Sequence, residues 1–185
     1  MYMLYTRAGD DGMTRNFDPK AKRISKSSCQ TESLGALDEL NSFLGMAKIM
    51  AKEVGWDIDG KTFGEIVFWV QNCLFIIQAE VAGAQKKIEK SKVKQLESWI
   101  ALIEKQLPPI KTFFISGGTQ LAVLFDISRT MTRKAERRVV SAFETGEIKV
   151  SKETLAFLNR LSTLFYAMAR LTNHKSGIKE DVPSY

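Results

Sequence analysis

Three arginines at helical spacing are the first side chains in this 185-residue chain with the potential for chemistry. Arg129, Arg133 and Arg137 recur every fourth residue, so on a helix they form one stripe with Glu136 beside it. Such a stripe needs either water or an anion. A solvated helix face and an anion-binding site are therefore the two interpretations to separate.

The residues just before this stripe favour the anion. A Gly117-Gly118 turn precedes a helix for which Thr119 is the expected N-cap. Free amides and the helix dipole at a helix N-terminus attract negative charge. Two aromatics, Phe113 and Phe114, stand immediately before the turn. Turn, helix start and arginine stripe together predict a site for a polyanion.

A second candidate for phosphate binding lies in an N-terminal arm, residues 1–30. Gly9 and Gly12 lie three residues apart, with hydroxyls at both ends of the segment 5–14 and Arg7 inside it. Backbone amides and side-chain donors of such a loop can wrap phosphates. The segment lacks the Gly-Lys-Ser/Thr ending of a Walker A loop, and an ordinary Asp-Gly turn is the alternative. Four basic residues follow, Lys20, Lys22, Arg23 and Lys26, and most of them are expected to be solvated.

Two further polar residues accompany apolar helix faces. Asp38 borders an apolar stripe, and a carboxylate there needs a partner because burying it unpaired is costly. That partner is either a nearby lysine or an arginine of the 129–137 stripe. Asn159 belongs to a polar stripe that is either solvated or placed to contact a base or ribose.

The hydrophobic periodicity predicts an all-α, up-and-down bundle of five helices in one domain covering residues 1–185. Strand signals are weak, and the tail 174–185 is expected to be loose. The expected helices cover roughly residues 31–53, 62–87, 88–107, 119–145 and 151–173.

Composition limits the function classes. The net charge is 27 − 21 = +6, which favours an acidic partner: a nucleotide, a nucleic acid or a membrane surface. Two cysteines do not suggest a disulfide framework, and a single histidine gives little material for a His-based metal site or catalytic triad. No leader and no long uncharged apolar run are present, so a soluble cytoplasmic protein without membrane association is expected.

Four segments together resemble the ATP:cob(I)alamin adenosyltransferases of the propanediol-utilisation type. The resemblance spans roughly residues 5–173, in order and at compatible spacing. The segments are Thr6-Arg7-Ala8-Gly9-Asp10-Asp11-Gly12-Met13-Thr14, Gly35-Ala36-Leu37-Asp38-Glu39-Leu40-Asn41-Ser42, the stretch from Gly117-Gly118-Thr119 to Arg137-Arg138, and Leu158-Asn159-Arg160-Leu161-Ser162.

The resemblance implies a homotrimer of five-helix bundles with ATP held between neighbouring subunits. The implied reaction transfers the 5′-deoxyadenosyl group of ATP to the cobalt of cob(I)alamin, giving adenosylcobalamin and triphosphate. Mg²⁺ is expected to bind through the ATP phosphates and not through a set of protein side chains. A reductase or a cobalamin-dependent enzyme is a possible further partner, and no nucleic acid is expected.

The resemblance also assigns roles by position. It implies catalytic roles for Asp38, Arg129 and Phe113, with Asp38 paired to Arg129 across the subunit interface. Cobalamin binding is assigned to Phe113, Gly117 and Gly118, and Phe113 presses on the lower face of the corrin. There Phe113 helps keep the cobalt free of its base ligand. Phosphates and Mg²⁺ are assigned to Thr6, Arg7, Gly9, Asp10, Gly12, Thr14 and Lys26, and the nucleotide to Arg129, Arg133, Glu136, Arg137 and Asn159.

The chain departs from the family pattern at five positions. Arg7 and Ala8 replace the usual lysine and threonine, which touches phosphate contacts, and Ser116 replaces a proline before the glycine turn. Lys134 and Thr163 replace a frequent arginine and aspartate. Two rival functions remain. A basic nucleic-acid-binding module leaves Asp38, Asn159 and the N-terminal motif unexplained, whereas a non-catalytic ATP-binding trimer shares all the binding residues.

Overall fold

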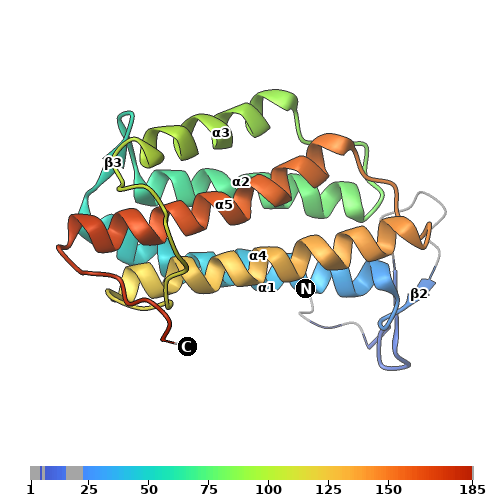
Figure 1. The fold of residues 1–185 in the computed structure, drawn as a ribbon. Helices are drawn as coiled ribbons and strands as arrows, with labels where there is room; N and C mark the ends of the chain where they lie inside the picture. Colours follow the sequence, from blue (N-terminus) through green and yellow to red (C-terminus); the bar gives the residue numbers. More distant parts are fainter. Residues whose placement is uncertain (1–4, 6, 16–22, 185) are drawn as a thin grey trace.

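Five long helices make up the computed structural model, which describes residues 5, 7–15 and 23–184. Successive helices run in opposite directions along one axis, as Figure 1 shows, so the expected up-and-down bundle is confirmed. The helices are α1 (Cys29–Val54), α2 (Phe63–Val81), α3 (Lys90–Glu104), α4 (Gln120–Glu144) and α5 (Lys152–Lys175).

The packing order differs from the chain order. Helix α1 packs against both α2 and α4, while α5 packs against α4 and α3. Aromatic rings fill the centre: Phe125 of α4 makes an edge contact with Phe63 of α2 and stacks on Phe165 of α5, at centroid distances of 6.0 and 6.2 Å. All three rings are fully buried. The contact between α4 and α5 matters most for function, because the candidate residues of both helices meet along it.

Side-chain caps fix where four of the helices begin. Thr119 accepts a hydrogen bond from the amide of Ala122, which confirms it as the N-cap of α4. Ser28 caps α1 and Ser151 caps α5 in the same way, and Thr62 forms a capping box with Glu65 on α2.

The predicted bounds of two helices were wrong. Helix α2 ends at Val81 instead of residue 87, and α3 covers Lys90–Glu104 instead of residues 88–107. Gly83 has φ 96°, a left-handed conformation that interrupts the helix and that glycine adopts easily.

The start of α5 is tied to the end of α2 by a buried carboxylate. Glu80, only 4% exposed, accepts hydrogen bonds from the Ser151 amide at 2.7 Å and from the hydroxyl of Thr154. These bonds satisfy donors at the N-terminus of α5 and place a negative charge at the positive end of its dipole. They fix the end of α5 from which Asn159 projects.

Two short antiparallel ribbons accompany the helices. Strands β1 (Met13–Arg15) and β2 (Arg23–Ser25) belong to the N-terminal arm, and β3 (Asp57–Ile58) and β4 (Lys61–Thr62) connect α1 with α2. The β3–β4 turn uses left-handed residues, Asp59 at φ 54° and Gly60 at φ 72°. Strands this short carry little periodicity, which explains their weak sequence signal.

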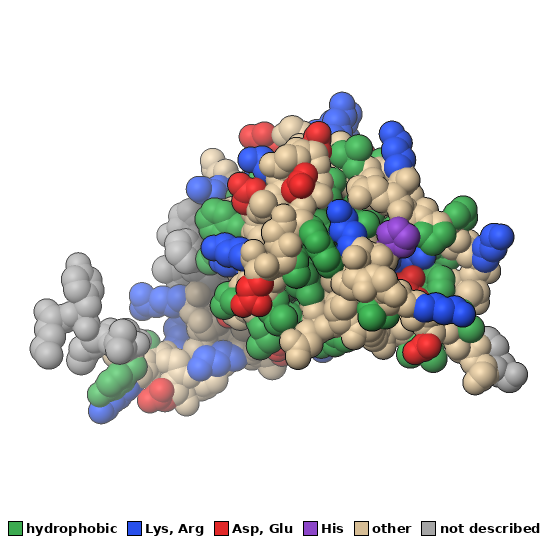
Figure 2. All heavy atoms as spheres, turned by 90° about the vertical axis from the view of Figure 1, so that its left-hand side faces the viewer, with side chains coloured by type: hydrophobic (Ala, Val, Ile, Leu, Met, Phe, Trp, Pro, Cys, Tyr) green, Lys and Arg blue, Asp and Glu red, His purple; other side chains and the backbone are tan. Residues whose placement is uncertain are grey.

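The end of the bundle where α5 terminates has a mixed surface. Figure 2 shows apolar side chains interspersed with basic and acidic ones on this face, so the positive charge does not gather there into one patch. Within the described residues, no helix is long and apolar enough to span a membrane. The cytoplasmic location expected from the sequence stays a prediction.

Candidate active site

A polar cavity of about 370 Å³ lies along the groove between α4 and α5. Three of the predicted nucleotide residues of α4, Arg133, Glu136 and Arg137, line it together with Asn159 of α5. Among the described residues, neither Arg133 nor Arg137 has a hydrogen-bonding or ion-pair partner. Two unpaired guanidinium groups beside one cavity are suited to binding phosphate oxygens.

Glu136 and Asn159 join the two walls of this polar cavity. The amide nitrogen of Asn159 donates to Oε1 of Glu136 at 3.1 Å, and its Oδ1 accepts from Arg160 at 2.6 Å. Arg160 in turn bonds Glu97 of α3 at 3.2 Å. The Asn159 side chain is thereby oriented from both sides, as a residue that contacts a nucleotide must be.

A second, aromatic cavity of about 630 Å³ adjoins the first. Its lining combines the connection before α4 with α4 and α5: Ile110, Lys111, Thr112, Phe113, Phe114, Arg129, Arg133, Ser162, Thr163 and Tyr166. Arg133 therefore lines both cavities. The two cavities therefore share one cationic side chain as part of their walls.

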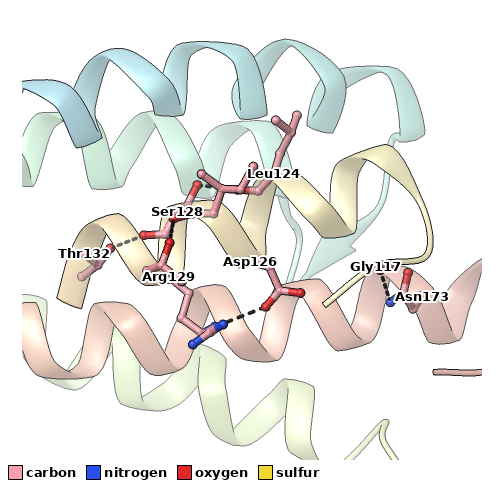
Figure 3. Close-up of polar contacts among 9 residues, drawn as sticks. Gly117, Leu124, Asp126, Ser128, Arg129, Thr132 and Asn173 are labelled. Carbon is pink, nitrogen blue, oxygen red and sulfur yellow. Dashed lines mark hydrogen bonds and ion pairs between the residues drawn. The ribbon is translucent and has the colours of Figure 1, made fainter. Parts of the chain in front are cut away.

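Arg129 is held toward the aromatic cavity from its own helix. Its Nε donates to Oδ1 of Asp126 at 3.2 Å, a contact visible in Figure 3, and its guanidinium carbon lies 6.0 Å from the centre of the Tyr166 ring. Burial raises the pKa of Tyr166 above its ordinary value. At neutral pH this cavity therefore presents a neutral phenol beside the Arg129 guanidinium, together with the cations of Lys111 and Arg133.

Phe113 is the most prominent apolar side chain of the site. It is 80% exposed, whereas its neighbour Phe114 is half-buried and stacks against Arg170 at 4.7 Å. A large exposed ring at the mouth of a cavity is expected where a ligand covers it.

Gly117 and Gly118, predicted to bind cobalamin, are not among the residues that line the two cavities. They form the turn between the Phe113 segment and α4. Gly118 has φ 92°, and a Cβ there would meet Asn173 at 2.2 Å, so glycine is required. In this structure the two glycines shape the loop that carries Phe113.

Asp38 is exposed on α1 and forms no hydrogen bond or ion pair with any described residue. The pairing of α1 with α4 is made by its neighbours instead, through Glu39 with Lys134 at 2.7 Å and Glu32 with Arg138 at 3.7 Å. The alternative of a partner lysine within the chain is therefore not observed in the described part. The pair between Asp38 and Arg129 of another subunit stays a prediction.

Hydrogen bonds join two described parts of the N-terminal arm, residues 7–15 and 23–26. Lys26 donates to the Gly9 carbonyl at 2.7 Å, and its amide donates to the Gly12 carbonyl at 2.9 Å. Arg23 bonds the Ala8 carbonyl at 2.7 Å and the Asp11 carboxylate at 2.6 Å, and it lowers the pKa of that carboxyl. Gly9, Gly12 and Lys26 are thus brought together, and the Arg7 carbonyl accepts from the Asp10 amide at 3.3 Å. Thr14 pairs with Ile24 in the β1–β2 ribbon, whereas Thr6 lies outside the described residues.

Sequence reasoning missed several residues that shape the site. Arg23 belongs to a group of four basic residues of which most were expected to be solvated, and it fastens the arm through the Ala8 carbonyl and Asp11. Asp126 could have been found from its i, i+3 spacing to Arg129, and Tyr166 from its place in the polar stripe that begins at Asn159. Asn173 belongs to the same stripe, but no local signal shows its partners, which lie more than fifty residues away.

A larger cavity, of about 830 Å³, lies where α2 ends and α5 begins, and none of the predicted residues lines it. Its carboxylate, Glu80, is already satisfied by the Ser151 amide and the Thr154 hydroxyl at the start of α5. The described part of the chain also contains no group of three His, Cys, Asp or Glu side chains that could hold a metal ion.

Comparison with known proteins identifies the family. Residues 4–172 match the family model described as cobalamin adenosyltransferase. The chain belongs to this family. A corrinoid adenosyltransferase of Bacillus subtilis (strain 168) is 36% identical over 179 residues, covering 95% of this chain and 89% of the relative. The corrinoid adenosyltransferase PduO of Citrobacter freundii is 32% identical over 92% of this chain, which spans half of that protein.

A solved structure agrees with this assignment. A variant PduO-type ATP:corrinoid adenosyltransferase from Lactobacillus reuteri, complexed with cobalamin and ATP, superposes with a TM-score of 0.86 at 28% identity, covering 98% of this chain and 96% of the other. The adenosyltransferase resemblance read from the four sequence segments is thus confirmed. The activity of this adenosyltransferase is the ATP-dependent adenosylation of cobalamin.

Proposed function

We propose that the polar cavity of this adenosyltransferase binds ATP and that the aromatic cavity receives the corrin. The observation that carries this assignment is Arg133, which lines both cavities. Transfer requires C5′ of ATP to lie in line with the cobalt, so the two substrates must meet at a shared wall. An arginine there contacts phosphate oxygens beside the reacting carbon.

The reaction needs placement more than a protein nucleophile. Cobalt(I) attacks C5′ with its own electron pair, the C5′–O5′ bond breaks, and its electrons leave with triphosphate. Holding two reactants in line contributes up to about 7–11 kcal/mol in well-oriented systems. Arg129, Arg133 and Arg137 stabilise the negative charge that develops on the departing oxygen.

The arm completes the phosphate site. Its carboxylate and hydroxyl oxygens, on Asp10 and Thr14, are of the type that Mg²⁺ prefers. The ion would bind mainly through ATP phosphates, where it neutralises charge on the triphosphate. Arg7 takes the place of the family lysine, and Lys26 contributes a second cation to the arm.

The aromatic cavity keeps water and a lower ligand away from the cobalt. Phe113, with Ile110 and the Tyr166 ring, provides an apolar surface facing the corrin. Water exclusion protects a reduced metal that would otherwise be oxidised, and an apolar ring offers no atom to coordinate the cobalt.

A second subunit is needed to complete the site in this proposal. Asp38 presents an exposed carboxylate without a described partner, and beside it α1 and α2 expose large apolar side chains: Met46, Ile49, Phe68 and Phe75. A cyclic trimer would cover this surface with the α4–α5 face of a neighbour and bring Asp38 to Arg129. A docking reductase stays a prediction.

An anaerobic assay tests the substrate assignment. The protein is mixed with Mg-ATP and chemically reduced cobalamin, and the visible spectrum is followed for loss of cobalt(I) and growth of the adenosyl form. Turnover that requires ATP and is lost in Arg129→Ala supports the assignment. ATP binding without turnover would favour the non-catalytic ATP-binding trimer. If neither ATP binding nor turnover is observed, the nucleic-acid-binding module would be favoured instead.

Mixed oligomers test the shared site. Asp38→Ala and Arg129→Ala are each expected to lose activity, since breaking a desolvated pair costs about 3–5 kcal/mol. If the two residues meet between subunits, co-expression of both variants restores about a quarter of the sites, because one site in four then joins an intact Asp38 to an intact Arg129. No recovery in the mixture, with trimers verified by ultracentrifugation, would contradict the pair.

A further inference from the structure

The segment that carries Phe113 is held by long-range contacts from the end of α5 and from the C-terminal tail. The sequence indicates a loose tail, but in the structure the backbone amide of Ile115 donates a hydrogen bond to the carbonyl oxygen of Asp181 in the tail at 2.8 Å. The connection 110–118 has no regular secondary structure of its own. Its conformation therefore depends on what it contacts.

Asn173 fastens the glycine turn at both ends. Its side-chain nitrogen donates to the Gly117 carbonyl at 3.0 Å, drawn in Figure 3, and its Oδ1 accepts from the Thr119 amide at 3.1 Å. The Asn173 side chain is 5% exposed. A buried amide with both functions satisfied by one turn fixes that turn and the N-terminus of α4.

Arg170, one turn earlier on α5, holds the residue next to Phe113. Its Nε bonds Glu180 of the tail at 3.0 Å, with side-chain exposures of only 5% and 16%. The same guanidinium lies 4.7 Å from the centre of the Phe114 ring. Glu180 thus orients Arg170, and Arg170 supports Phe114.

The exposure of side chains 113–115 follows from these contacts with Arg170 and the tail. Phe113 and Ile115 are 80% and 55% exposed, while Phe114 between them is half-buried against Arg170. In an extended segment, alternate side chains point to opposite sides. Anchoring Phe114 inward and the Ile115 amide to the tail therefore turns Phe113 outward into the aromatic cavity.

We propose that Arg170, Asn173 and Glu180 are positioning residues for Phe113, so that the C-terminal tail sets the geometry of the corrin face. The inference rests on the proposed role of Phe113. None of the three residues lines the aromatic cavity. They act on the cobalt only through the loop, which makes the proposal separable from a direct role in binding.

A matched pair of neighbouring variants tests the tail. Glu180→Gln removes the charge that holds Arg170, whereas Asp181→Asn removes the same charge from a residue whose backbone carbonyl alone makes the contact. We expect Glu180→Gln to lower kcat about tenfold at unchanged KM for ATP, as small misplacements of reacting groups do, and Asp181→Asn to stay within about twofold. Equal effects of the two variants, or a loss confined to KM for ATP, would overturn the proposal.

A spectroscopic reading separates positioning from general damage. Electron paramagnetic resonance of bound cob(II)alamin reports whether the lower base still coordinates the cobalt. Glu180→Gln is expected to raise the base-coordinated fraction without changing the thermal midpoint of the protein by more than a few degrees, and Asn173→Asp, which loses the donor to the Gly117 carbonyl, is expected to raise the same fraction. An unchanged fraction in both variants would contradict the proposal.

A double-mutant cycle distinguishes this inference from the proposed function. If Glu180 acts through Phe113, Glu180→Gln slows the enzyme about tenfold in the wild type but less than about twofold in a Phe113→Ala background. Independent, multiplying effects would overturn the positioning role while leaving Phe113 in place. A Phe113→Ala variant with normal kcat would remove the assigned role of Phe113, and the inference with it.

Discussion

The polar cavity takes every lining residue from two helices, six from α4 and Asn159 from α5, whereas the aromatic cavity takes five of its ten from the connection before α4. Helix backbone is supported by its own hydrogen bonds and by the core, so its side chains keep their spacing without further contacts. The connection has no such support and is held instead by Asn173, Arg170 and the tail.

Because the two cavities are supported differently, substitutions in them should impair the enzyme in different ways. A substitution in the polar cavity removes a contact to ATP and leaves the frame intact. A substitution around the aromatic cavity can move Phe113 without touching a substrate. Variants should therefore separate into those that change nucleotide affinity and those that change the chemical step.

Arg133 should give the largest effect because it belongs to both cavities. Arg133→Ala is expected to lower kcat/KM about a thousandfold, since it removes a charged donor beside the reacting carbon. Arg133→Lys should have a kcat/KM between those of the wild type and Arg133→Ala, because lysine keeps the positive charge but lacks the planar guanidinium with its two parallel donors. Steady-state kinetics with ATP and cob(I)alamin measure both.

Arg138 provides the control for Arg133. It lies on the same helix but pairs loosely with Glu32 at 3.7 Å and lines neither cavity. Arg138→Ala should stay within about twofold of the wild type, as exposed ion pairs contribute little. Comparable losses in both arginine variants would contradict the special position of Arg133.

Phe113→Ala comes next and should affect one cavity only. ATP affinity, measured by calorimetry, is expected to be unchanged, while the rate of cobalt alkylation falls about a hundredfold because the corrin loses its apolar support. Phe143→Ala, which removes another exposed aromatic from α4, is the control. A parallel loss of ATP affinity in Phe113→Ala would show that the two cavities are not separate.

The comparison also explains what the sequence could predict. Arg133, Glu136 and Arg137 share one α4 face because helical spacing alone decides it, and the five-helix bundle follows from the same periodicity. The role of Gly118 depends on Asn173, fifty-five residues later, and that of Phe114 on a tail glutamate. Such contacts arise only when the chain folds, so the sequence analysis indicated a loose tail and could not reveal the support of the loop.

The N-terminal arm, like the connection before α4, contains a loop held by a side chain from later in the chain, here Arg23. Arg23→Ala should raise KM for ATP about fivefold with little change in kcat, since Arg23 holds the Ala8 carbonyl and Asp11 but is largely exposed. Arg23→Lys should recover part of the affinity. An altered kcat with normal KM would instead place the arm in the chemical step.

Tyr166→Phe should have the smallest effect and yet sharpen the account of the aromatic cavity. Burial raises the pKa of Tyr166, so its phenol stays protonated from about pH 6 to about pH 9 and contributes shape without charge. Its contribution to stability is complete below the unfolded value of about 10 and is lost only as the pH rises through the higher folded value. The activity and the pH profile of Tyr166→Phe should therefore match those of the wild type within about twofold.

Tyr166→Ala, which removes the ring over Arg129, should slow alkylation much more. A profile of Tyr166→Phe that changes between pH 7 and pH 9 would mean that the hydroxyl carries a proton in the reaction, and that the aromatic cavity does more than exclude water.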